Sequence, residues 1–155
     1  KTEMQPFFRR VNYLKNNKGP VLFQLPPRWN LNPERLSDFL KMLPKGNRYT
    51  FEFRNDTWYN QQVYDLLKAR NCAFCIYHLS GHLSPLVVTA DFVYVRLHGP
   101  GGKYQGKYTT AALKTWAKRC KEWMSDGKDV FVYFDNDDQG YAVFNAKSLA
   151  GMLAS

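Results

Sequence analysis

DFVYVRLHGPGGKYQGKY, residues 91–108, joins an apolar strand to a glycine-rich loop that carries two lysines. Side chains alternate between the two faces of a strand, so Tyr94, Arg96 and His98 share one face. The aliphatic residues at 93, 95 and 97 share the other face. A strand buried through its aliphatic face thus turns an arginine and a histidine toward a common point. We predict a binding site at the carboxyl end of this strand.

Strands and helices alternate on both sides of this stretch. Short apolar runs predict strands over 21–25, 49–54, 73–78, 91–98 and 129–135. Amphipathic periodicity predicts helices over 4–15, 33–43, 56–70, 110–126 and 142–153, and residues 79–89 resemble a loop. The expected helix caps are Asn32, Asp56 and either Thr109 or Thr110. This alternation is typical of parallel strands joined by crossover helices, so we expect one α/β domain over residues 1–155.

The composition fits a folded protein with a basic surface. The chain has 155 residues, 45% of them hydrophobic, and a formal net charge of +9. That charge suits a phosphorylated ligand, nucleic acid or a ribosomal contact, and it is also compatible with no more than a soluble surface. There is no apolar run of about 18 residues, so we expect no membrane span or membrane partner.

The amino end and the cysteines suggest where the protein works. Residues 1–10 show neither a signal-peptide pattern nor an initiator Met, which suggests a piece of a longer protein. Three cysteines, an odd number, suit a reducing cytoplasm better than a disulfide framework. Cys72 and Cys75 are three residues apart at one strand, so we expect their thiols on opposite faces as buried packing groups.

Polar residues collect late in the predicted strands. They are Gln24, Glu52, Arg54, His78, Arg96, His98, Asp135 and Asn136. In parallel α/β folds ligands bind at this carboxyl edge, so we predict that Glu52, Arg54, Arg96, His98 and Asp135 or Asn136 converge there. If Glu52 neutralises one of the two arginines, the other remains for a ligand. The alternative is a purely structural salt-bridge network of Glu52 with Arg54 or Arg96.

The loop from Gly99 to Gly106 is a candidate anion site. Glycines let backbone amides approach an anion, and Lys103 adds positive charge. The loop follows the next-to-last strand, where barrels often hold phosphate. It matches no Walker motif or dinucleotide fingerprint, and its glycines are alternatively explained by turns alone.

The polar residues are compatible with two further chemistries. Imidazole and carboxylate groups suit zinc, iron or manganese, and the available ligands are His78, His82, His98, Asp135 and Asp137. No metalloprotease spacing is present, so we favour hydrogen bonds within the polar cluster and predict no metal. Glu52 beside His98 is a candidate general acid–base pair. The sequence identifies no cofactor.

Four segments in the same order resemble the YecE-like proteins, from about Gly19 to the carboxyl end. They are VLFQLPP at 21–27, EFR-x-x-x-W at 52–58, YVRLHGPGGKYQGKY at 94–108 and YFDNDDQGYAVFNA at 133–146. The resemblance implies a TIM-barrel-like (β/α)8 fold of unknown function, of which this chain carries the last five strands. It also implies that three strands precede residue 1. The family's recurrent polar positions fall here on Glu52, Arg54, Trp58, Arg96, His98, Gly99, Asn136, Gly140 and Asn145. Asp135 stands where many relatives have Asn.

Two functions remain open. The first is an enzyme that acts on an anionic or phosphorylated small molecule, with Glu52, His98 and Asp135 as catalytic residues. Its expected binding residues are Gln24, Arg54, Trp58, His78, Arg96, Gly99, Gly101, Gly102, Lys103, Tyr104 and Asn136. Trp58 follows a strand end, where it either walls a pocket or packs the start of a helix. The second function is a non-catalytic module that binds nucleic acid or another partner through the basic surface.

Overall fold

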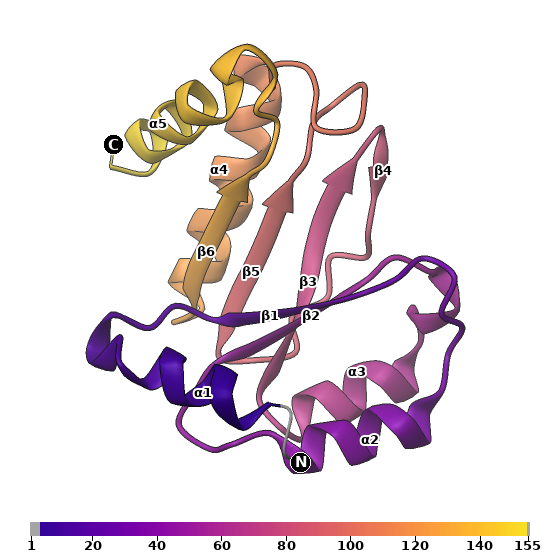
Figure 1. Ribbon diagram of the computed structural model, residues 1–155. Helices are drawn as coiled ribbons and strands as arrows, with labels where there is room; N and C mark the ends of the chain where they lie inside the picture. The colour runs from indigo at the N-terminus through magenta and orange to yellow at the C-terminus, as the bar shows by residue number, and fades with distance from the viewer. Residues whose placement is uncertain (1–3, 155) are drawn as a thin grey trace.

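The computed structural model describes residues 4–154 (Figure 1). The strands are β1 Val21–Leu25, β2 Tyr49–Phe53, β3 Cys72–Leu79, β4 His82–Leu83, β5 Phe92–Leu97 and β6 Asp129–Phe134. The helices are α1 Gln5–Asn12, α2 Pro33–Met42, α3 Gln61–Lys68, α4 Thr110–Ser125 and α5 Tyr141–Ala154. Three short 3-10 turns cover Lys15–Asn17, Asp56–Trp58 and Asp138–Gly140.

The five long strands form one parallel sheet in the order β1-β2-β3-β5-β6. Each strand pairs in parallel with its neighbour, for example Gln24 opposite Glu52 and Arg96 opposite Tyr133. The predicted side-by-side parallel order is therefore confirmed. Because parallel strands share a direction, all five carboxyl ends lie along one edge of the sheet.

The two faces of the sheet carry different cores. On one face α2 packs on α3 and α3 on β3, while α4 and α5 pack on each other and on β6 (Figure 1). That face holds a large aromatic and aliphatic cluster that includes Phe51, Phe53 and Phe74. The other face, here called the inner face, holds a smaller cluster of Ala73, Cys75, Tyr77, Ala90, Phe92 and Tyr94. The helices therefore anchor one face and leave the other available to the site.

Two local expectations about turns need correction. Within 79–89, expected as a loop, β4 pairs antiparallel with the end of β3. Ser80 and Gly81 have φ values of 51° and 80°, which turn the chain tightly enough for this short hairpin. The predicted helix at 56–70 is also interrupted, since Asp56 starts a 3-10 turn and Asn60 caps α3 through a bond from the Val63 amide. The caps at Asn32 and Thr109 are confirmed.

The cysteines lie where the strand period places them. Cys72 packs in the helix-side cluster and Cys75 in the inner-face cluster, so the predicted divergence of their thiols is confirmed. Both are buried and free of disulfide bonds. Among residues 4–154, no helix is long and apolar enough to cross a membrane.

We predict that Phe53→Ala lowers the free energy of unfolding by about 3–5 kcal/mol, because the ring is fully buried and stacks on Trp58 at 4.8 Å. Urea denaturation followed by tryptophan fluorescence measures the change. The matched control is Phe144→Ala on α5, whose ring is 61% exposed, and this variant should change stability by less than about 0.5 kcal/mol. Equal effects of the two variants would contradict this description of the core.

Candidate functional site

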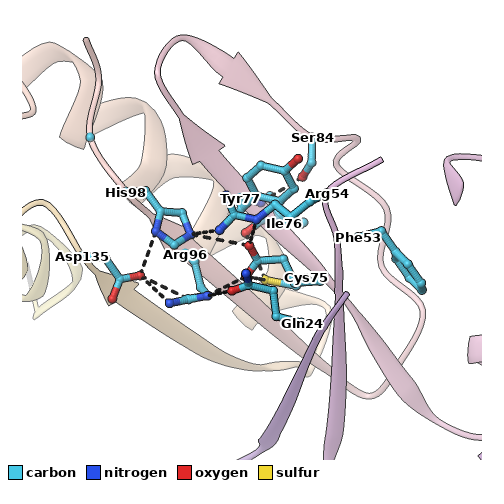
Figure 2. Close-up of polar contacts among 12 residues, drawn as sticks. Gln24, Phe53, Arg54, Cys75, Ile76, Tyr77, Ser84, Arg96, His98 and Asp135 are labelled. Carbon is cyan, nitrogen blue, oxygen red and sulfur yellow. Dashed lines mark hydrogen bonds and ion pairs between the residues drawn. The ribbon is translucent and has the colours of Figure 1, made fainter. Parts of the chain in front are cut away.

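Seven side chains meet where the parallel strands end, and we call them the carboxyl-edge cluster (Figure 2). The cluster consists of Gln24, Glu52, Arg54, Cys75, Arg96, His98 and Asp135. Its members come from β1, β2, β3 and β5 or from residues directly after a strand. All of them project from the inner face, as the period of two requires. The predicted convergence of the polar residues is thus present in the structure.

Glu52 lies at the centre of the cluster and is completely buried. One carboxylate oxygen accepts a short hydrogen bond from Arg54 Nε, and the other accepts one from Arg96 Nη1 at 2.7 Å. The Cys75 thiol lies 3.6 Å from the second oxygen and donates to it. Both oxygens are therefore occupied by protein donors.

The protonation of Glu52 follows from these contacts. Burial by itself raises the pKa of a carboxyl, but the positive charges of Arg54 and Arg96 and the hydrogen bond from Arg96 outweigh it and lower the pKa from 4.5 to about 2. At neutral pH the group is a fixed anion. It is suited to holding two guanidinium groups in place and poorly suited to exchanging protons.

Arg96 joins the two carboxylates of the cluster. Its Nη1 donates to Glu52 and, at 3.1 Å, to the amide oxygen of Gln24. Its Nε and Nη2 both lie 3.1 Å from Asp135 Oδ2. Two arginines thus face two carboxylates, and the expectation that one arginine remains free of an acidic partner is wrong.

Arg54 retains hydrogen-bond donors that no protein group uses within residues 4–154. Its Nε is bonded to Glu52 and its Nη2 lies 3.0 Å from His98 Nε2, while its guanidinium covers the Tyr77 ring at 4.6 Å. Within residues 4–154, Nη1 makes no hydrogen bond. The cluster is therefore balanced in charge but has an excess of hydrogen-bond donors.

His98 is buried, and its neighbours define its tautomer. A guanidinium can only donate, so His98 Nε2 must accept from Arg54 and the imidazole proton resides on Nδ1. Nδ1 faces Asp135 Oδ2 at 3.3 Å, without the alignment of a full hydrogen bond. His98 thus presents its proton to Asp135.

The cluster is accessible at one end. The Glu52 and His98 side chains are buried, whereas the Asp135 side chain is 29% exposed and Gln24 is exposed. Tyr104, from the glycine-rich loop, packs edge-on to His98 with ring centres 5.3 Å apart and remains 48% exposed. A ligand approaching the cluster therefore meets Asp135, Gln24 and Tyr104 first.

The glycine-rich loop is shaped by Gly99. Its φ is +124°, and a Cβ atom there would collide with the carbonyl oxygen of Gln105, so no other residue fits. The Gly99 amide donates to the Tyr108 hydroxyl at 3.1 Å, which makes this amide unavailable to an anion. Gly101 and Lys103 are exposed, and Gly102 forms a bridge with Gln105. The loop folds back over its own beginning and presents its cation to solvent.

Three predicted site residues lie outside the cluster. His78 is on the opposite face of β3, where Nδ1 and the Tyr108 hydroxyl are 2.9 Å apart. Trp58 is buried against Phe53, and its indole N–H donates to the Trp29 carbonyl at 2.8 Å. Asn136 is also buried and donates to Gly106 and to Asn145. These three residues therefore lie outside the carboxyl-edge cluster, and their part in binding a ligand stays a prediction.

The structure also adds residues that the sequence analysis did not assign to the site. The sequence predicts Cys75 only as a packing thiol and does not single out Tyr77. Both lie on the inner face of β3, two residues apart. The alternation of side chains along a strand is the feature of the sequence that predicts this shared face. Tyr77 bonds the Tyr59 hydroxyl at 2.9 Å, and both rings lie beside His82 of β4. In the described part of the chain, no three His, Cys, Asp or Glu side chains are placed to share a metal ion.

The fold and the edge position define an α/β protein with a polar cluster at the carboxyl ends of parallel strands. The chain belongs to the family described as protein of unknown function DUF72, whose model matches residues 1–155. The match therefore starts before Gly19, where the resemblance seen in the sequence began.

Individual relatives agree with this family. The chain is 30% identical to the UPF0759 protein YunF of Bacillus subtilis over 91% of its own length and 60% of the relative's length. A crystal structure of a DUF72 family protein from Thermotoga maritima is similar with a TM-score of 0.89 at 24% identity, over 98% of this chain and 65% of that one. A DUF72 family protein from Enterococcus faecalis gives a TM-score of 0.77 at 20% identity, over 98% and 65%. The two structures establish the fold, and the chain spans less than two thirds of each relative.

We predict that Glu52→Gln destabilises the protein by about 3–5 kcal/mol at neutral pH, since it leaves two guanidinium groups without their central anion. Glutamine resembles a protonated glutamic acid, so the difference should depend on pH. The folded-state pKa is below the unfolded value, so the stability from ionised Glu52 is full above pH 4.5 and is lost as pH falls toward about 2. The lost part amounts to about 3 kcal/mol.

Urea denaturation of the wild type and of Glu52→Gln over a series of pH values measures the difference between their free energies of unfolding. This difference should become steadily smaller as pH falls through the acid range. A difference that stays constant as pH falls would contradict the assignment of Glu52 as a fixed anion.

Proposed function

We propose that the protein is a YecE-like, TIM-barrel-like enzyme that acts on an anionic or phosphorylated small molecule at the carboxyl edge. The observation that carries this proposal is the Asp135 carboxylate, which lies partly exposed against the buried His98 and the partly exposed Arg96. Barrel enzymes place their reacting groups at this edge. A barrel is supported by the sequential parallel order of the strands and by the helices that pack on one face of the sheet.

In the proposed reaction Asp135 is the general base. Its Oδ2 is held by Arg96 and faces His98 Nδ1, while no hydrogen bond within residues 4–154 engages Oδ1. A substrate hydroxyl or acidic C–H placed at Oδ1 would transfer its proton there. The His98 Nδ1–H group faces Asp135 Oδ2 at 3.3 Å and stabilises the charge on Asp135 before the transfer. Glu52 is a positioning residue in this scheme, because its pKa is too low for it to carry a proton.

Two sets of groups bind the anionic part of the substrate in this proposal. Arg54 Nη1 supplies unused donors at the floor of the site. Lys103 and Lys107 are exposed on the glycine-rich loop, which also places Tyr104 against His98. Because the buried cluster is already balanced in charge, the loop lysines supply the net attraction for phosphate.

We predict that Asp135→Asn abolishes proton transfer with little effect on anion binding. Conversion of a panel of phosphorylated small molecules, followed by mass spectrometry, should fall about 100-fold or more, the usual contribution of a general base. The dissociation constant of inorganic phosphate, measured by chemical-shift titration, should stay within about threefold, because Asn keeps the shape of the side chain. Conversion at the wild-type rate would overturn the role of Asp135.

We predict that Lys103→Gln/Lys107→Gln weakens phosphate binding several-fold through the loss of two positive charges. The matched control, Lys114→Gln/Lys121→Gln on α4, removes the same charge from the far side of the sheet and should leave phosphate binding unchanged. Equal losses in the two double variants would mean that phosphate responds only to net charge, and the proposed location would be wrong.

A further inference from the structure

A polar pocket lies at the opposite edge of the sheet, where the strands begin. It has a volume of about 530 Å³. Its walls are the segment before β1 and the turn before β2, and its residues are Lys15, Asn16, Lys18, Gly19, Gly46, Asn47 and Arg48. We call it the amino-edge basic pocket. Gly19 lies two residues before β1 and Arg48 directly precedes β2, so the pocket is separated from the carboxyl-edge cluster by the length of the strands.

Two of the three positive charges that line this pocket, Lys15 and Lys18, are not neutralised. No carboxylate is among its lining residues. Lys18 Nζ contacts two neutral acceptors, Asn47 Oδ1 at 3.1 Å and Asn12 Oδ1 at 3.5 Å, which orient the ammonium without cancelling its charge. Lys15 is exposed and forms no ion pair within residues 4–154. Two cations are thus held at one pocket and are free to attract an anion.

Arg48 has a different role in the same pocket. Its guanidinium pairs with Asp129 at the start of β6 and lies over the Phe92 and Phe131 rings at 5.5 and 5.6 Å. These contacts attach the turn before β2 to the inner face of the sheet. Arg48 therefore fixes the wall of the pocket, and Lys15 and Lys18 supply its net charge.

The surroundings of the pocket are basic and include an exposed aromatic ring. Between Met4 and Pro33 the sequence has five Lys or Arg residues and no Asp or Glu. Tyr13, two residues before Lys15, is 78% exposed. Cations that follow a phosphate backbone, next to an aromatic ring on which a base can stack, are the two features that single-stranded nucleic-acid sites share.

We propose that the amino-edge basic pocket binds single-stranded nucleic acid. Lys15 and Lys18 contact successive phosphates, and Tyr13 stacks on a base beside them. This inference is independent of the reaction at Asp135, because it uses no residue of the carboxyl-edge cluster.

The groove beside α4 offers a matched control surface. It is larger, at about 820 Å³, and three lysines line it. Glu122 and Asp126 line the same groove, and Lys118 lies 3.9 Å from Glu122, so its charges are partly neutralised. Replacement of Lys114 and Lys121 changes the net charge as much as replacement of Lys15 and Lys18 does.

The experiment measures binding of a labelled single-stranded RNA of mixed sequence by fluorescence anisotropy over a series of salt concentrations. In Lys15→Gln/Lys18→Gln the affinity at low salt should fall about tenfold or more. The slope of log affinity against log salt should become less negative by about 1.4, or about 0.7 for each lost phosphate contact. Lys114→Gln/Lys121→Gln should keep the wild-type slope. Thermal denaturation verifies that each variant is folded.

The contribution of the base is tested at Tyr13. Tyr13→Ala should weaken RNA binding about fivefold, whereas Tyr13→Phe, which keeps the ring, should bind as the wild type does. Heparin, a polyanion without bases, should bind equally to all three proteins. The proposal is overturned if RNA does not bind, if both double-lysine variants lose the same slope, or if Tyr13→Ala binds RNA as tightly as the wild type.

Discussion

The buried carboxylate of Glu52 is the constraint on which the carboxyl edge depends. An isolated anion at a fully buried position is strongly unfavourable, so its two oxygens require donors from several strands. Arg54 comes from the end of the same strand, and Arg96 reaches across from β5. A buried ion pair of this kind contributes little net stability compared with an apolar core. Its evident effect is to fix the directions of two guanidinium groups, and through them the positions of His98 and Asp135.

The sequence was sufficient to predict the parallel α/β sheet and most of this cluster. Parallel order followed from the alternation of strands and helices, and the inward direction of Arg96 and His98 followed from the period of β5. Two predicted site residues, His78 and Trp58, lie outside the cluster for one physical reason. His78 and Trp58 were assigned by their position late in or after a strand, but the face on which a side chain lies depends on parity and on the following turn. One residue of offset places His78 beside Tyr108 rather than beside His98.

The two ends of the parallel strands differ in how their charges are compensated. At the carboxyl edge, carboxylates and guanidinium groups balance, and the polarity is fixed by short-range hydrogen bonds. At the amino edge, Lys18 is oriented by amides that leave its charge intact. The first arrangement favours discrimination among small ligands at close range, and the second favours long-range attraction that salt weakens. A single parallel sheet can keep them apart because all its strands point the same way.

The contact of Cys75 with Glu52 affects the chemical reactivity of the Cys75 thiol. Its thiol is fully buried, and burial together with the neighbouring anion raises its pKa well above the ordinary range. The native thiol is therefore inert to alkylating reagents, and its modification rate reports how often the inner face opens to water. Cys72 lies in the helix-side cluster and Cys120 on α4, both buried. The modification rates of the three native thiols would therefore report the local unfolding of separate parts of the fold, without any engineered cysteine.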